Sequence, residues 1–247
     1  MSTASRFFST DSTKAIKAQG YGYLNAINYM APASTGGVGN LCPHASPGCL
    51  ALCLGWYSGQ AAMLSNAELE TGSNAVRASR ARKAQQFMHD RKAFLATMRK
   101  GIQAAQRKAQ REGLKLCVRP NGATDIVWES VAPTLFTEFA DVQFVDYTKN
   151  YRRMLRFCQG KLPRNYHLTF SRSETNWPEC LDVLRAGGNV AVVFAEKPAS
   201  TTTFNGWSVV DGDAHDLRHL DPKGGVIIAL SPKGRKTKLD QSGFVVR

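Results

Sequence analysis

Three cysteines stand close together in the first quarter of the chain. Residues 40–53 read NLCPHASPGCLALC and place Cys42, Cys49 and Cys53 in the spacing C-x6-C-x3-C. Two prolines and a glycine keep the first half of this stretch in a loop. No helix breaker follows Cys49 until Gly55, so Cys49 and Cys53 are expected one helical turn apart on the same face. The pattern predicts three thiolates that converge on one point.

Converging thiolates are ligands for zinc or for an iron–sulfur cluster. Three cysteines suit a [4Fe–4S] cluster with one iron open, or a zinc ion with a further non-cysteine ligand. No nearby Cys-x2-Cys knuckle completes a structural zinc pattern, which favours iron–sulfur over zinc. His44 and Cys117 are candidates for a fourth ligand, whereas Cys158 and Cys180 fall in predicted helices as packing residues. The alternative interpretation is that the three cysteines are simply buried or free.

Composition limits the classes of protein that fit. The chain has 247 residues, 43% hydrophobic, with a formal net charge of +13. No apolar run approaches the roughly 20 residues of a membrane span, and no secretory signal is visible at the start. We therefore expect a cytoplasmic protein without a membrane partner, in a compartment that favours metal or free-thiol chemistry over disulfides. Much of the excess charge lies in residues 74–112, with eleven Lys or Arg and two acids.

The elements that position the cysteines follow an α/β pattern. Residues 1–20 are expected to form a flexible arm or an edge segment, and residues 21–247 a single domain. That domain starts with a strand at 21–30 and continues with a long basic helix at 74–111. Short β-branched runs then alternate with helix-length segments. The expected strands are 116–118, 142–145, 167–170, 190–194, 207–210 and 226–230, and the expected helices are 128–140, 151–159 and 177–186. This alternation predicts a parallel sheet, as a partial or closed TIM-like (βα) barrel or, alternatively, an open doubly wound sheet.

Polar residues recur just after these strands. In parallel α/β folds the carboxyl ends of the strands form the rim where ligands bind, and the cysteine loop follows the first strand onto that rim. The candidate catalytic residues are Asp125, Glu129, Asp146, Lys149, Glu174, Asp211, Asp213 and His215. The candidate substrate-binding residues are Arg119, Asn121, Ser171, Ser173, Arg218 and Lys233. The alternative is that they are ordinary caps, turns and surface ion pairs.

The long basic helix suggests a second kind of partner. A row of cations gives sequence-independent, salt-sensitive binding to the phosphates of DNA or RNA. The candidate nucleic-acid-binding residues are Arg80, Lys83, Arg91, Arg99, Lys100, Arg107 and Lys108. The alternative is a solvated face that keeps the protein soluble.

Several longer motifs carry a resemblance to a known family. They are CPHASPGC and CLALC, RPNGATDIVWE at 119–129, VQFVDYTK at 142–149, NYHLTFSRSE at 165–174 and VVDGDAHDLRHLD at 209–221. Together they make the chain resemble the gene-product-88-like family of tailed-bacteriophage proteins from about residue 23 to 246. Pro120 departs from the family's usual Arg-Leu-Asn-Gly. The resemblance implies a barrel-like α/β fold in the host cytoplasm and an iron–sulfur site at the three cysteines, but it supplies no reaction.

A looser resemblance concerns architecture alone. Radical S-adenosylmethionine enzymes also place three cysteines in the loop after the first strand of a partial barrel. Their spacing is C-x3-C-x2-C, and their glycine-rich methionine-binding motif is not evident in this chain. The likeness is therefore an analogy.

Three functions are consistent with these patterns. The first is an enzyme of redox or radical type, in which an open iron faces a small-molecule or nucleotide substrate on the rim. The second is a nucleic-acid-binding protein with a structural metal site. The third is an interaction or regulatory protein without catalysis. The chain has no P-loop, no Rossmann glycine fingerprint and no G-x-S-x-G elbow, so the classes that depend on those motifs are excluded.

Overall fold

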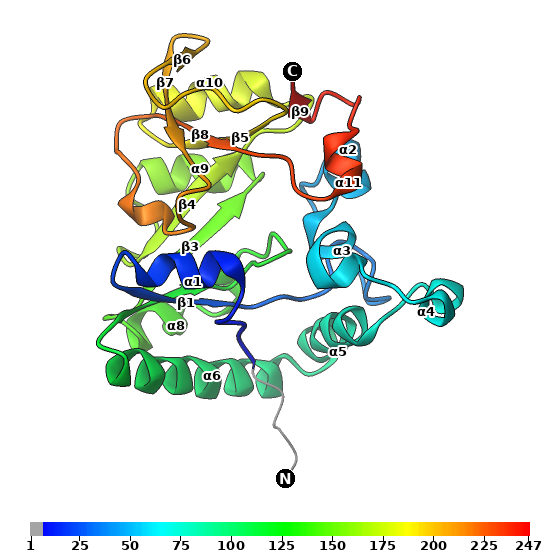
Figure 1. Ribbon diagram of the computed structural model, residues 1–247. Helices are drawn as coiled ribbons and strands as arrows, with labels where there is room; N and C mark the ends of the chain where they lie inside the picture. Colours follow the sequence, from blue (N-terminus) through cyan, green and yellow to red (C-terminus); the bar gives the residue numbers. More distant parts are fainter. Residues whose placement is uncertain (1–6) are drawn as a thin grey trace.

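A computed structural model describes residues 7–247, which form an α/β fold around one mostly parallel sheet (Figure 1). The order of strands is β1-β2-β3-β4-β5-β8-β7-β6, and β9 pairs with the far end of β5. Every pairing between them is parallel except the β6–β7 hairpin. The strands are β1 Tyr23–Ile27, β2 Lys115–Arg119, β3 Gln143–Thr148, β4 Tyr166–Ser171, β5 Val190–Phe194, β6 Thr203–Phe204, β7 Trp207–Asp211, β8 Ile227–Leu230 and β9 Val245–Val246.

The helices lie between these strands. They are α1 Thr13–Gln19, α2 Pro47–Ala51, α3 Leu54–Tyr57, η1 Gly59–Ala62, α4 Asn66–Thr71, α5 Ala75–His89, α6 Arg91–Arg111, α7 Trp128–Val131, α8 Thr134–Glu138, α9 Tyr151–Cys158, α10 Trp177–Arg185, η2 Arg218–Leu220 and α11 Arg235–Lys238. None of the helices in the described part of the chain is long and apolar enough to span a membrane.

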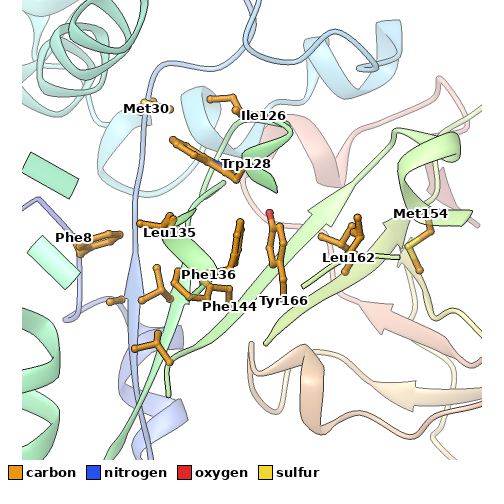
Figure 2. Packing of buried hydrophobic residues seen from close by; sticks show 14 of the residues in the cluster. Phe8, Met30, Ile126, Trp128, Leu135, Phe136, Phe144, Met154, Leu162 and Tyr166 are labelled. Carbon is orange, nitrogen blue, oxygen red and sulfur yellow. The ribbon is translucent and has the colours of Figure 1, made fainter. Parts of the chain in front are cut away.

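The two faces of the sheet are covered differently. On one face, α6 packs against β1 and β2 while α9 and α10 pack against β3 to β5, and this layer holds the main core. Figure 2 shows part of it, where the rings of Phe136 and Tyr166 stack and Phe144 packs edge-on against Phe136. On the other face, Cys117 and Val145 pack with the α1 residue Ala18 and with Leu217, next to η2. Alternation along the strands separates these two sets.

The predicted α/β class and mostly parallel sheet are confirmed, but the sheet does not close into a barrel. Its last parallel strand, β7, is followed at the edge by the antiparallel β6. The segment after β7 returns across the sheet to α1, where Lys17 Nζ donates to the backbone oxygen of Asp213 at 2.9 Å. The ring of His215 lies 4.6 Å from that of Tyr21. This segment covers the face beside β1 that a closed barrel would enclose.

Two predicted boundaries are wrong. Residues 7–20 are not a flexible arm, and the alternative of an edge segment fits better: Ser9 bridges to Ile27 of the edge strand β1, and Ala15 and Ala18 of α1 are fully buried. Residues 1–6 of the predicted arm lie outside the described residues. The single basic helix is two helices, because Asp90 leaves helical geometry and caps α6 by accepting from the backbone N–H of Ala93 at 3.0 Å. An aspartate is a favoured N-cap residue, so it starts a new helix in place of extending the old one.

The later elements fall where the sequence predicts them. Each of the six β-branched runs after residue 115 overlaps a strand, and the segments 151–159 and 177–186 are α9 and α10. The predicted helix 128–140 is divided into α7 and α8 by Pro133, which removes a helical backbone donor. The two-residue strands β6 and β9 are too short to have a periodic signal.

Candidate metal centre at the carboxyl ends of the strands

The three cysteines come from three short pieces of backbone beyond β1. Cys42 lies in a loop, Cys49 lies inside α2, and Cys53 is the N-cap residue of α3. The expected continuous helix ends at Leu52, so Cys49 and Cys53 do not share one helix face. In Figure 1, α2, α3 and α11 lie together on one side of the molecule, beyond the end of β1.

The helix that carries Cys49 is held by a carboxylate from another strand end. Ser46 caps α2, and its hydroxyl donates to Glu174 Oε2 at 2.7 Å. The backbone N–H of Gly48 donates to Glu174 Oε1, also at 2.7 Å. A Cβ at Gly48 would lie 2.8 Å from Glu174 Oε2 and 2.8 Å from Ser242 Oγ. Only glycine leaves room for this approach, and the carboxylate fixes where Cys49 sits.

Cys42 and Gly55, which lies two residues after Cys53, both pack against Ala123, which follows β2. The Cys42 thiol lies 3.6 Å from the carbonyl oxygen of Ala123 and accepts the backbone N–H of Ala33 at 3.3 Å. Beside Cys53, a Cβ at Gly55 would lie 2.3 Å from the Cβ of Ala123. The loop after β1 and the start of α3 therefore meet on the loop after β2.

The electrostatics of these thiols differ from those of exposed cysteines. The pKa of Cys42 is raised to about 12, chiefly by burial and also by the charges of Cys53, Asp125 and Cys49, while the N–H of Ala33 opposes this. Burial also raises the pKa of Cys53, against the backbone N–H groups of Gly55 and Trp56 and the charge of Arg80. Both thiols stay protonated at neutral pH unless a bound cation stabilises the thiolates.

The three cysteines are chemically suitable ligands for a metal, although their spacing is not that of a formed metal site. Across residues 7–247, no group of three His, Cys, Asp or Glu side chains is arranged to hold a metal ion. Yet Cys53 and Cys49 are near enough to raise the pKa of Cys42, and backbone N–H groups point at Cys42 and Cys53. Thiolates are the ligands of iron–sulfur clusters and of structural zinc, and hydrogen bonds to sulfur stabilise them.

The other proposed ligands lie elsewhere or at the surface. His44 is exposed on the same loop as Cys42. Cys117 is fully buried against Ala18 and Val145, on the sheet face that α1 covers. Cys158 packs beside the main core, and Cys180 is a fully buried member of it.

Asn121, in the loop that carries Ala123, is the centre of a buried hydrogen-bond network. Its side-chain oxygen accepts from Thr124 Oγ1 at 2.8 Å, the Ile126 backbone N–H at 3.0 Å and Trp128 Nε1 at 3.0 Å. Its amide nitrogen donates to Asp146 Oδ2 at 3.0 Å. These bonds fold residues 121–128 into a fixed loop, and the backbone N–H of Asp125 donates to Leu41 at 2.9 Å, directly before Cys42.

An arginine completes this network from α9. Arg153 binds Glu129 through two nitrogens at 2.9 and 2.8 Å and lies 3.4 Å from Asp125 Oδ1. It also donates to the hydroxyl of Tyr166, which in turn donates to Asp146 at 2.6 Å. Complete burial raises the pKa of Asp146 to about 7, although Tyr166, Arg153, Arg119 and Asn121 all stabilise the charged form. We call this network the hub; its members are Asn121, Asp125, Glu129, Asp146, Arg153 and Tyr166.

Four hub residues are among the candidate site residues predicted from the sequence, and two are not. Asn121, Asp125, Glu129 and Asp146 were candidate site residues, and the structure brings them together as a support for the cysteine loop. Arg153 and Tyr166 were not singled out. The available signal for Arg153 was its place one turn after the capping residue Asn150.

Comparison with known proteins confirms the family resemblance that the sequence motifs indicate. A family model described as Gene product 88 matches residues 6–247. The chain belongs to the gene product 88 family. No curated protein and no solved structure matches the chain.

Within this gene product 88 chain, the remaining rim candidates fall into separate groups. Lys149 Nζ donates to Ser171 Oγ at 2.8 Å. The pKa of Glu174 is lowered despite burial, because the Gly48 N–H, the Ser46 hydroxyl and the charge of Lys149 stabilise its carboxylate. Ser173 is buried, and its backbone N–H donates to Asn176 at 2.6 Å. Glu174 thus joins the pair Lys149 and Ser171 to α2.

A second group lies at the ends of β5, β7 and β8. Lys197 Nζ lies 2.5 Å from Asp211 and 3.6 Å from Asp213, and Lys233 Nζ lies 3.4 Å from Asp213. These residues neutralise one another in a partly exposed cluster.

The last group lies on the sheet face that α1 and η2 cover. Arg119 Nη1 pairs with Asp216 at 2.9 Å, with its guanidinium 4.7 Å from the centre of the Tyr147 ring. Arg218 is fully buried, with its Nε 3.2 Å from Asp221 Oδ2, and its Nη2 donates to His215. Arg119, His215 and Arg218 hold the segment after β7 in place.

The predicted nucleic-acid-binding residues do not form one exposed row. Arg80 bonds to the Gly55 carbonyl beside Cys53, and Lys83 bonds to the Phe7 carbonyl and has its pKa lowered to about 8 by burial. Arg99 binds Glu138, Lys108 binds Thr10, and Arg91 stacks on Phe87. Lys100 and Arg107 remain exposed on α6. The described cations of this set therefore divide between internal contacts and the surface.

Proposed function

We propose that the protein is an iron–sulfur protein in which Cys42, Cys49 and Cys53 hold a [4Fe–4S] cluster at the carboxyl ends of the strands. Three cysteine ligands leave one iron of the cluster open to a substrate. That iron would act as a Lewis acid or exchange electrons with the substrate. Zinc, with a fourth ligand from another group, is the alternative ion for the same cysteines.

The observation that carries this proposal is that the three thiols lie close together, near enough for Cys53 and Cys49 to raise the pKa of Cys42. They come from separate backbone pieces, and each piece is held by a different part of the fold. Cys42 and Cys53 have their pKa raised by burial, so the chain alone does not make them reactive thiolates. Their arrangement suits groups that become thiolates when a metal binds.

The residues around the cysteines have distinct tasks under this proposal. Glu174 positions Cys49 through Gly48, and Asn121 holds the loop on which Cys42 rests. Arg80 supplies positive charge beside Cys53. Lys149, which bonds to Ser171 and influences Glu174, is the candidate group for binding an anionic small molecule or nucleotide. This assigns a redox or radical-type reaction to the rim, with the hub as its support.

The test is the metal content of protein purified without oxygen, compared across cysteine variants. We expect brown protein with about four iron and four sulfide per chain. Cys42→Ser, Cys49→Ser and Cys53→Ser should each lose most of the iron. Cys158→Ala and Cys180→Ala are matched controls that should keep it. Equal iron in both sets of variants would reject the cysteine assignment.

A further inference from the structure

Two exposed leucines lie next to cysteines of the proposed cluster site. Leu50 follows Cys49, Leu54 follows Cys53, and their side chains are 44% and 47% exposed. Residues 40–63 contain no Asp, Glu, Lys or Arg, so the outer surface of α2 and α3 has no charge of its own. A partner that covers Leu50 and Leu54 would therefore contact residues that are adjacent in the chain to two of the three cysteines.

A basic segment from the far end of the chain adjoins this apolar surface. Residues 232–239, PKGRKTKL, carry four cations and no acid. Lys236 Nζ lies 3.6 Å from the centre of the Tyr57 ring on α3. A Cβ at Gly48 of α2 would meet Ser242 at 2.8 Å. Leu239, which is 66% exposed, lies between these two contacts in the chain.

We propose that this surface, formed by Leu50, Leu54 and Leu239 with the cations of α11, docks an acidic protein that carries one electron to the cluster. The proposal rests on the proposed function, because the cluster is what receives the electron. The reduced carrier would lose one electron, and a cluster held by Cys42, Cys49 and Cys53 would gain it, with no bond or proton involved. Weak electron-transfer complexes use small interfaces of this kind, with an apolar centre and complementary charge around it.

The charges and the side chains argue against other occupants. A second copy of the chain would bring one strongly basic molecule against another, since the net charge is +13. Single-stranded nucleic acid binds on aromatic stacking surfaces, whereas the large exposed hydrophobic side chains of this surface are the leucines Leu50, Leu54 and Leu239. A membrane-surface helix needs several turns with one apolar face, whereas α2 has five residues and α3 has four.

The test uses anaerobically purified full-length protein and, as the probe, a plant-type [2Fe–2S] ferredoxin of net negative charge. Binding is measured by titration calorimetry, and cluster reduction by stopped-flow absorption with pre-reduced ferredoxin. We expect both to weaken as salt rises. Arg235→Glu with Lys238→Glu should weaken both at least tenfold, and Leu50→Ser with Leu54→Ser should do the same. Reduction by dithionite should be unchanged in every variant.

Matched controls separate this surface from general charge and hydrophobicity. Lys100→Glu with Arg107→Glu reverses the same charge on α6, and Leu220→Ser replaces a leucine that is 43% exposed on η2. Both should behave as wild type. If the protein holds iron and all variants react alike, the docking surface is wrong while the proposed function stands. Variant-sensitive binding to anionic vesicles without binding to ferredoxin also overturns the docking proposal. Protein without iron overturns the proposed function, and this inference with it.

Discussion

The hub and the cysteine rim, by which we mean Cys42, Cys49 and Cys53 with the backbone that holds them, are adjacent but are built in opposite ways. In the hub, buried charges have partners: Arg153 binds Glu129 and Asp125, and Asp146 accepts from Tyr166 and Asn121. At the rim, two thiols have their pKa raised by burial while backbone N–H groups point at them. The hub is complete within the chain, whereas the rim is organised to stabilise sulfur charge that the chain alone does not produce. This difference is the reason for proposing that the ligand binds at the cysteines and that the hub supports them.

The largest effect is expected from breaking the hub at Arg153. Arg153→Met leaves Glu129, whose side chain is 5% exposed, without its cation. Removing one partner of a buried ion pair costs about 3–5 kcal/mol, so the free energy of unfolding should fall by that amount in urea denaturation. Arg152→Met is the matched control on the exposed side of α9 and should change it by less than about 0.5 kcal/mol. Equal effects would show that the hub does not stabilise the fold.

The hub should also give the protein a specific dependence on pH. The pKa of Asp146 rises from 3.8 to about 7 on folding, so the folded state holds its proton more tightly. The stability that this proton contributes is fully present below the unfolded pKa and is lost as pH rises through about 7. Asp146→Asn removes the titration, and urea unfolding at acid and neutral pH should show a smaller loss with rising pH than wild type. Parallel pH profiles would contradict the shift.

At the rim, the expected effect on stability is smaller and local. Glu174→Gln weakens the contacts to Ser46 and Gly48, worth about 1–2 kcal/mol together because the carboxylate is partly exposed. Hydrogen exchange should accelerate in α2 and not in β3, and iron content should fall. Glu196→Gln, at an exposed residue, is the control. Unchanged exchange in α2 would mean that Glu174 does not position Cys49.

The smallest effect on stability is expected on α6. Lys100→Glu with Arg107→Glu should change the free energy of unfolding by less than about 0.5 kcal/mol. If this face contacts DNA or RNA, each lost phosphate contact lowers the slope of log affinity against log salt by about 0.7–0.9, measurable by fluorescence anisotropy. No binding of wild-type protein at low salt would reject the nucleic-acid hypothesis.

The sequence predicted the strands well because they are buried β-branched runs, and it predicted the cysteine loop at the end of the first strand. It did not predict where the helices break, because one capping aspartate outweighed the apolar stripe that runs across Asp90. Among the site residues, residue type identified Asp125, Glu129 and Asp146 but not their role. That role depends on Arg153 and Tyr166, which reach them from α9 and β4, and such contacts leave no local pattern in the sequence.

The most direct test of the difference between hub and rim is to measure iron, zinc and acid-labile sulfide per chain in anaerobically purified protein. Wild type and Arg153→Met are compared under conditions in which both remain folded. The account predicts about four iron and four sulfide in wild type. Arg153→Met should keep this ratio of iron to sulfide at lower stability, because the hub supports the site without binding the cluster. Colourless wild-type protein that contains neither iron nor zinc would contradict the central claim that the cysteine rim is where the ligand binds.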